Sequence, residues 1–388
     1  MNEGRPRAQF RGRLPAILVE LVHAGRRWRT PRLHSYAPRP LLELPEHVPE
    51  RASVPAIDAH THLGRWLHPA GAWMEGDVGR LLEEMDATNV AAVVNLDGRW
   101  GRELEENLDR YDRAHPGRFH TFCHLDWRLL DERDGPDLLV ESLRRSAAAG
   151  ARGLKVWKDL GLAVRSAGRH VLVDDPMLDA VWQSAAEAGM PVVVHTADPK
   201  AFFLPADRRN ERLEEMLLHP KSTRHAGGLA LRERLIDSFE HMVASHPATT
   251  FIAAHACCPE NLARVGTMLH RYPNLSIDVG AVASELGRQP RASRELVLAH
   301  SDRVLFGTDV FPWRRATRQV YFRLLETADE AFAHSPGLSP SCRWQIYGLD
   351  LPAWVLEKIY RDNAVGVLGI APMREPAAPG RRVEESRR

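Results

Sequence analysis

The chain has 388 residues, of which 44% are apolar and 27% charged, and its formal net charge at pH 7 is +1. This length allows one large barrel-type domain or two domains of average size, and the apolar content can supply a sizeable core. A net charge so close to zero provides no global field toward nucleic acid or an anionic membrane surface, so we expect a small-molecule substrate and neither of those partners.

Residues 1–50 are predicted to form a basic N-terminal extension. The first forty residues carry nine arginines and two glutamates, and the apolar piece Leu14–Gly25 contains Glu20 and His23 and has no small-residue cleavage site after it. These features favour a basic arm with one short helix over a secretory signal. A disordered extension explains the same composition equally well.

Cysteine usage and hydropathy indicate the cellular setting. The four cysteines form no C-x-x-C pair, and adjacent Cys257 and Cys258 suit packing better than a structural disulfide or metal ligation. We therefore expect reduced thiols and a cytoplasmic protein. No apolar run reaches the roughly 18 residues that a membrane-spanning helix needs.

Residues 51–370 alternate short β-branched apolar runs with longer helical patterns. The runs predicted as strands are Ala56–Ala59, Val90–Leu96, Phe119–Leu125, Arg152–Trp157, Pro191–Thr196, Thr249–Ala256, Asn274–Gly280 and Arg303–Asp309. The segments predicted as helices are Asp77–Thr88, Arg102–His115, Asp137–Ala149, Pro176–Ala188, Leu229–Ser245, Glu260–Arg271 and Pro290–His300. In the fourth helix Pro176 stands at the first position and Gly189 follows the last, which is typical of helix boundaries.

These alternations predict a (β/α)8 TIM barrel over residues 51–370, because strands buried on both faces of a parallel sheet read as continuous apolar runs. An open doubly wound sheet is the alternative, but no G-x-G-x-x-G motif follows the first strand. The segment Ala197–Gly228 after the fifth strand is long, and loops at this end of a barrel build the active-site face. We predict that it is a lid or pocket wall, and that residues 371–388 are disordered.

Residues able to bind metal stand where predicted strands end. His60 and His62 end the first strand on one face, with Cα atoms about 6.6 Å apart, so both imidazoles can converge on one ion. His195 and His255 end the fifth and sixth strands, and Asp309 ends the eighth. Each histidine alone fits a hydrogen-bonded core residue, and Asp309 alone fits a helix cap. Their joint position at carboxyl ends, which ring one opening in a barrel, favours a zinc or similar divalent-metal site.

Several of these segments together resemble the amidohydrolase superfamily, in particular its amidohydrolase-related branch of metal-dependent hydrolases and non-oxidative decarboxylases. The similarity covers about residues 54–370, and the order of the motifs is more specific than any one of them. The motifs are DAHTHLG (58–64), GLKVWK (153–158), VVVHTADP (192–199), FIAAHAC (251–257), VLFGTDVFP (304–312) and VLEKIYRDNAVGVLG (355–369).

The resemblance implies that His60, His62, His195 and Asp309 are metal ligands. It implies that His255 hydrogen-bonds the attacking water or the substrate in a one-metal site, or binds a second metal. Lys155 occupies the place where some relatives have a carboxylated lysine that bridges two metals, and an amine that binds substrate or forms a salt bridge is the alternative. The branch mostly uses one metal, so we expect one Zn²⁺, with Mn²⁺ or a second ion as alternatives. A homodimer is also expected.

Further side chains near these strand ends are candidate substrate contacts. Lys158 follows the fourth strand, and Asp198, Phe202 and Asn210 lie in the long loop after the fifth strand. Arg288, after the seventh strand, is a candidate anion anchor. Alternatively, Phe202 packs the lid and the segment around Asn210 begins a solvated helix.

The leading functional hypothesis is a metal-dependent hydrolase of a small amide, lactone or ester, in which Asp309 accepts a proton and His255 steadies developing charge. A non-oxidative decarboxylase of an aromatic or unsaturated carboxylate would use the same residues, with Asp309 or His255 protonating the carbon that loses carbon dioxide. A metal-binding barrel without catalysis is the third hypothesis.

Overall fold

A computed structural model describes residues 41–221, 223, 225–310, 314–334 and 343–370. The chain divides into two compact units, Met1–Glu43 and Leu44–Arg388, and the second unit contains every helix and strand described below. Residues 41–49 have no regular secondary structure. The predictions for the rest of the basic arm, for Phe311–Trp313 and for residues 371–388 lie outside the described residues.

Eight parallel strands form two sheets. One sheet has the order β1-β2-β3 and the other β10-β9-β8-β7-β4. The strands are β1 (Ala56–Thr61), β2 (Val90–Asn95), β3 (Phe119–Thr121), β4 (Leu154–Val156), β7 (Val192–Val194), β8 (Phe251–Ala253), β9 (Leu275–Asp278) and β10 (Val304–Leu305). β1 extends past its predicted run, Ala56–Ala59, to Thr61, and each of the other seven lies within its predicted run. The eight predicted strands are therefore confirmed, seven of them with shorter bounds.

The two sheets meet at both edges. An isolated parallel bridge pairs Cys123, just after β3, with Leu154 of β4, and a second pairs Thr61 of β1 with Val310, which follows β10. Backbone hydrogen bonds from Lys155 to Cys123 and from Asp309 to His60, each 2.8 Å long, support these junctions. The strands therefore follow one another around a ring, and the predicted (β/α)8 barrel is confirmed.

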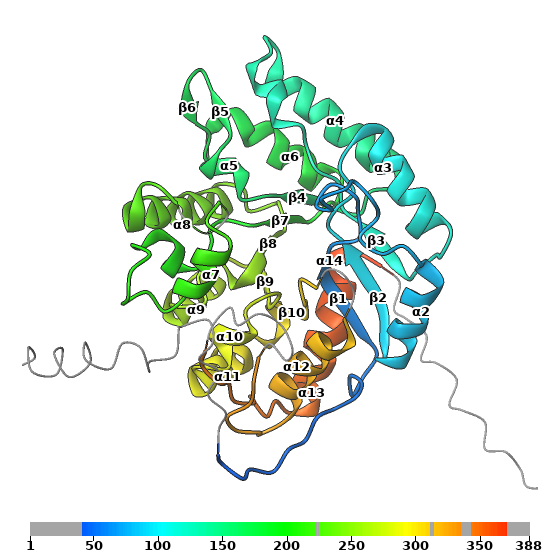
Figure 1. Ribbon diagram of the computed structural model, residues 1–388. Coiled ribbons are helices and arrows are strands. Elements are labelled where there is room, and N and C mark those ends of the chain that lie inside the picture. The colour runs from blue at the N-terminus through cyan, green and yellow to red at the C-terminus, as the bar shows by residue number, and fades with distance from the viewer. Residues whose placement is uncertain (1–40, 222, 224, 311–313, 335–342, 371–388) are drawn as a thin grey trace, which may run out of the picture. The chain divides into compact units, whose positions relative to one another are not determined.

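Helices surround the strands of this unit in Figure 1. They are α2 (Val78–Ala87), α3 (Gly101–Leu108), α4 (Gly135–Ala149), α5 (Asp159–Leu162), α6 (Asp179–Glu187), α7 (Leu213–Leu218), α8 (Gly228–Ser245), α9 (Leu262–Arg271), α10 (Ala283–Leu286), α11 (Pro290–Ala299), α12 (Arg315–Glu326), α13 (Ala353–Glu357) and α14 (Asn363–Leu368). A hairpin of β5 (Arg165–Ser166) and β6 (Arg169–His170) follows α5. Every predicted helix has a counterpart, and α12 to α14 come after the last one predicted.

Short turns and caps explain several boundaries. The 3-10 turn η5 (Pro176–Leu178) leads into α6, and Gly189 after that helix has φ 63°, which confirms both predicted boundary residues. The side chain of Asp77 caps α2 by accepting a hydrogen bond of 3.0 Å from the backbone N–H of Arg80. Helix α4 ends at Gly150, whose φ of 115° is easily adopted by glycine.

Alternation along the strands separates two apolar layers. On β2, Val93 packs outward with the helices, whereas Ala92 and Val94 belong to the cluster inside the barrel. Ala364 and Leu368 of α14 join this inner cluster, so α14 covers one end of the barrel interior. The polar side chains at the strand ends therefore lie next to this cluster of buried apolar residues.

The long segment after β7 contains the 3-10 turn η6 (Lys200–Phe203) and helix α7. Ala201, Phe202 and Phe203 in η6 are buried, so this loop packs onto the barrel through its aromatic residues. Among the residues described, none of the helices combines the length and apolarity that crossing a membrane requires.

Candidate active site

His60, in β1, and His62, just after it, face the carboxylate that follows β10. His60 Nε2 lies 3.5 Å from Oδ1 of Asp309, and His62 Nε2 lies 3.0 Å from the same oxygen. Both histidines are buried, and the backbone of Asp309 itself is left-handed, with φ 57°. Residues from opposite ends of the domain sequence thus place two imidazole nitrogens and one carboxylate oxygen in a single group.

Two buried aspartates hold the other nitrogen of each ring. His60 Nδ1 lies 2.9 Å from Asp278 Oδ2, and His62 Nδ1 lies 2.8 Å from Asp97 Oδ1. Because a carboxylate accepts hydrogen bonds, each Nδ1 carries a hydrogen and each Nε2 is left to face Asp309. Neither aspartate was predicted as a site residue. Asp97 directly follows the predicted run Val90–Leu96 and could have been found as a strand-end carboxylate, whereas Asp278 lies inside the run Asn274–Gly280.

The group fits a divalent cation. Imidazole nitrogen and carboxylate oxygen are the donors that zinc and similar ions prefer, and they bind at about 2.0–2.2 Å. Donor atoms that share one such ion lie roughly 3 Å apart, and the two histidine nitrogens lie at 3.5 and 3.0 Å from Oδ1 of Asp309. His60, His255 and Asp278 form a second possible group. There His60 Nδ1 already bonds Asp278, which makes Asp278 an outer-shell partner of the first group.

Electrostatics at this group favour positive charge. Burial alone would lower the pKa of His62, but Asp97 and Asp309 outweigh it and raise that pKa to about 9. Burial would raise the pKa of Asp309, yet His60, His62 and His255 together hold it below its usual range. Without an ion, a proton on His62 therefore neutralises Asp309, and metal binding must release that proton.

His255 occupies a strained turn above the strands. The predicted strand Thr249–Ala256 ends at Ala253, because His255 and the two residues after it have positive φ values of 57°, 52° and 59°. His255 Nδ1 lies 2.8 Å from the carbonyl oxygen of Gly280 and so carries a hydrogen. Because Nδ1 is engaged in this bond, Nε2 is the nitrogen available for chemistry. The ring centroid lies 4.7 Å from that of His60.

His195 lies beside His255 and faces a polar cluster. The ring centroids of the two histidines are 4.5 Å apart, and His195 Nε2 lies 3.6 Å from Oδ1 of Asp198. Asp198 also contacts Lys158 Nζ at 2.7 Å and His225 Nε2 at 2.6 Å. Burial lowers the pKa of His195 to about 3, so its ring is neutral, the form that a metal ligand requires.

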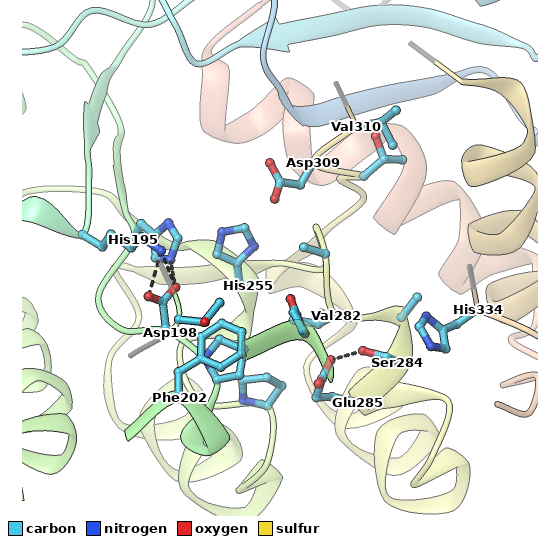
Figure 2. A pocket seen from close by; sticks show the side chains of 18 of the residues that line it. His195, Asp198, Phe202, His255, Val282, Ser284, Glu285, Asp309, Val310 and His334 are labelled. Carbon is cyan, nitrogen blue, oxygen red and sulfur yellow. Dashed lines mark hydrogen bonds and ion pairs between the residues drawn. The ribbon is translucent and has the colours of Figure 1, made fainter. Parts of the chain in front are cut away.

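A cavity of about 720 Å³ opens above these residues. Figure 2 shows His195, His255, Asp309 and Phe202 around it. The cavity is also lined by His62, Trp157, Lys158, Asp198, Thr308 and Tyr321. This volume is in the usual range for a small-molecule site.

The family model described as Amidohydrolase matches residues 57–370. The chain belongs to the amidohydrolase family. No curated protein matches it.

Solved structures similar to this amidohydrolase confirm its fold. A 2,6-dihydroxybenzoate decarboxylase from Rhizobium is 18% identical, with 82% of this chain and 99% of that chain covered and a TM-score of 0.51. A dihydroxybenzoic acid decarboxylase from Polaromonas sp. JS666, with bound manganese and the inhibitor 2-nitroresorcinol, is 13% identical over 81% and 97% of the chains, with a TM-score of 0.51. A TIM-barrel protein from Bordetella bronchiseptica is 14% identical over 81% and 98%, with a TM-score of 0.50.

Two predicted substrate residues of the amidohydrolase do not line the cavity. The side-chain amide of Asn210 donates to the carbonyl oxygens of Ala201 and Pro205, at 2.8 and 3.1 Å, and thereby shapes the long loop. Arg288 pairs with Glu211 at 2.8 Å, and its guanidinium lies 4.0 Å from the ring centroid of Trp344. Both side chains therefore make contacts within the protein, and neither has a role in the proposed function.

Lys155 of the amidohydrolase is buried below the cavity. Its side chain is 1% exposed, and Nζ has no hydrogen-bond partner among the described residues. Nζ lies 5.3 Å from the ring centroid of Trp157. Burial lowers the pKa of Lys155 to about 8, although three nearby carboxylates act to raise it. Of the two lysines in the GLKVWK motif, Lys158 is the one that lines the cavity.

Replacing Lys155 with methionine is expected to stabilise the metal-free amidohydrolase at pH 7. Burial lowers the pKa of Lys155 from 10.5 to about 8. The folded state therefore carries a penalty below pH 8, about 3 kcal/mol at most, which disappears as the pH rises toward 10.5. Denaturant unfolding with a chelator present should show a gain at pH 7 that shrinks by pH 10.

The control for this substitution is Lys358→Met. Lys358 is partly exposed and pairs with the exposed Asp302, so its removal should change the free energy of unfolding little at either pH. An equal gain for both variants, or no gain for Lys155→Met at pH 7, would contradict a buried and unpaired Lys155 cation.

Proposed function

We propose that this amidohydrolase is a metal-dependent hydrolase of a small amide, lactone or ester. The observation that carries the proposal is the position of Asp309, whose Oδ1 faces Nε2 of His60 and His62 at 3.5 and 3.0 Å on the wall of the cavity. A carboxylate placed there can both contact a cation and move a proton. His255 lines the same cavity.

One divalent cation would be held by His60, His62 and Asp309, with His195 as the fourth predicted ligand. Zinc suits these donors, and manganese is the alternative, since the similar structure from Polaromonas contains manganese. When bound, such a cation supplies Lewis acidity toward a carbonyl oxygen and makes water nucleophilic near neutral pH.

In this proposal Asp309 transfers protons and His255 stabilises negative charge on the substrate. Asp309 accepts the proton of the attacking water and passes it to the leaving nitrogen or oxygen. His255 keeps its Nδ1 hydrogen on the carbonyl oxygen of Gly280, so in its protonated form Nε2 donates to the substrate oxygen on which negative charge develops. Trp157 and Phe202 supply apolar walls that orient the substrate and exclude water.

Non-oxidative decarboxylation of an aromatic or unsaturated carboxylate is the second candidate. It is favoured by the similarity to two structures named as dihydroxybenzoate decarboxylases. Asp309 or His255 would then protonate the carbon atom from which carbon dioxide departs. The flat rings around the cavity would suit an aromatic acid equally well.

Product analysis of the zinc-loaded and manganese-loaded protein separates the two reactions. The hydrolase proposal predicts turnover within a panel of lactones, esters and amides, and no carbon dioxide from a matched panel of hydroxybenzoates and unsaturated acids. Carbon dioxide release without turnover in the first panel would establish the decarboxylase. Failure of both panels at full metal occupancy would favour the non-catalytic barrel.

A further inference from the structure

We propose that Asp278 is a positioning residue that orients both His60 and His255. The proposal rests on the proposed function only in taking His60 as a metal ligand and His255 as a catalytic residue. Asp278 is the last residue of β9 and is fully buried. It does not line the cavity, so it acts through its neighbours.

Both carboxylate oxygens of Asp278 face hydrogen-bond donors. Oδ2 accepts from Nδ1 of His60 at 2.9 Å. Oδ1 accepts from the backbone N–H groups of Gly280, at 2.9 Å, and His255, at 3.2 Å. One side chain thus connects β1, the second residue after β9 and the turn after β8.

Gly280 extends this connection to the ring of His255. Its N–H is held by Asp278, and its carbonyl oxygen accepts from Nδ1 of His255 at 2.8 Å. The turn at His255 needs such support, because three successive non-glycine residues with positive φ are each energetically unfavourable. Asp278 therefore fixes the backbone at His255 directly and its imidazole through Gly280.

Gly280 also leaves the space in which His60 and Asp278 meet. A Cβ atom at this position would lie 3.1 Å from Asp278 Oδ1 and 3.2 Å from both Cγ and Nδ1 of His60. Those contacts are tighter than ordinary packing allows, so even alanine at position 280 would push the His60–Asp278 pair apart.

Only a carboxylate satisfies all of these donors. In the substitution Asp278→Asn, an amide oxygen aimed at His60 leaves the NH₂ group facing the N–H groups of Gly280 and His255. The opposite orientation places NH₂ against Nδ1–H of His60. That ring must then move its hydrogen to Nε2, which removes the lone pair from the metal group. Either orientation disturbs one of the two histidines.

The test compares Asp278→Asn with the matched variant Asp97→Asn, using Co²⁺ as the metal probe. Asp97 accepts from Nδ1 of His62 at 2.8 Å, from Trp66 Nε1 at 2.7 Å and from Gly64 N at 3.2 Å, and it has no bond to the turn of His255. Both variants should bind Co²⁺ about 10–100-fold more weakly, with altered d–d absorption. Only Asp278→Asn should also lower kcat at saturating Co²⁺ with little change in KM.

Gly280→Ala is a second variant, which keeps the carboxylate and is useful if Asp278→Asn folds poorly. It should weaken Co²⁺ binding and alter the absorption in the same way. Gly366→Ala is its control, because a Cβ atom at Gly366 in α14 meets no atom within 4 Å. That control should bind Co²⁺ like the wild type.

Nitrogen-15 NMR of the metal-free protein shows which ring nitrogen of each histidine carries the hydrogen, and it needs neither substrate nor metal. We expect wild-type His60 and His255 to carry their hydrogen on Nδ1, and at least one of these two rings to lose that pattern in Asp278→Asn while both keep it in Asp97→Asn. Unchanged rings and unchanged Co²⁺ absorption in Asp278→Asn would overturn the positioning role. Wild-type protein that shows the expected rings but binds no Co²⁺ would instead overturn the proposed metal site.

Discussion

Replacing Asp309 with asparagine is expected to lower kcat about 10²–10⁴-fold, the usual effect of removing a general acid–base residue. Asparagine has nearly the shape of aspartate and can still contact His60 and His62 through its oxygen, but it cannot accept a proton. The measurement is kcat at saturating metal on the substrate identified from the panels, together with metal content per chain.

The control for Asp309→Asn is Asp302→Asn. Asp302 is largely exposed and pairs with Lys358 at the surface, so the same chemical change there should leave kcat within about a factor of two, as for most exposed ion pairs. Undiminished activity of Asp309→Asn at full metal occupancy would remove Asp309 from the proton transfer in both candidate reactions.

Replacing His62 with asparagine should largely abolish metal binding. Its Nε2 lies 3.0 Å from Asp309 Oδ1, while its Nδ1 is held by Asp97. An asparagine amide can donate to Asp97 and so limit the loss of stability, but it does not reach the position of Nε2. Because loss of an outer-shell partner alone typically costs 10–100-fold in metal affinity, we expect a loss greater than about 100-fold.

Competition with a chromophoric chelator measures this affinity. His241→Asn is the control, since His241 is exposed and pairs with Asp174 at the surface. This variant should match the metal affinity measured for the wild type. Wild-type affinity in His62→Asn, with a normal unfolding midpoint, would exclude His62 from the ligands.

The barrel could be predicted because its signals are local. Apolar runs of β-branched residues mark β2 and β7, and Pro176 and Gly189 mark the limits of one helix. The strand ends were less certain, since the runs ending in His255 and Asp309 continue as left-handed turns. Hydrophobicity alone does not reveal a change in backbone conformation, so seven of the eight predicted strands were too long.

The candidate site could be predicted only in part. His60 and His62 carry the spacing of a strand face in their own sequence, and His255 and Asp309 were found because carboxyl ends of barrel strands meet. Asp278 lies in an apolar run that reads simply as a strand. Its role depends on the N–H of nearby Gly280 and on two donors from other segments of the chain, His60 and His255.

Substrate contacts were the least predictable. Asn210 and Arg288 are polar residues in loops near strand ends, which is where specificity residues are commonly found. In the folded protein Asn210 binds loop carbonyls and Arg288 pairs with Glu211 beside Trp344. A polar side chain takes the nearest partner that the fold offers, and that partner cannot be read from composition.

The sequence by itself determined the barrel, the donor types and the order in which they occur, because periodicity and residue chemistry are carried along the chain. Only the tertiary structure decided which nitrogen of His60 and His62 faces Asp309, since that choice is made by Asp278 and Asp97 from distant strands. It also decided that Lys155 is buried with no hydrogen-bond partner in the described part of the chain, while Lys158 reaches the cavity. Hydrogen bonds and burial act over a few ångströms in space, and residues far apart in sequence meet only when the barrel closes.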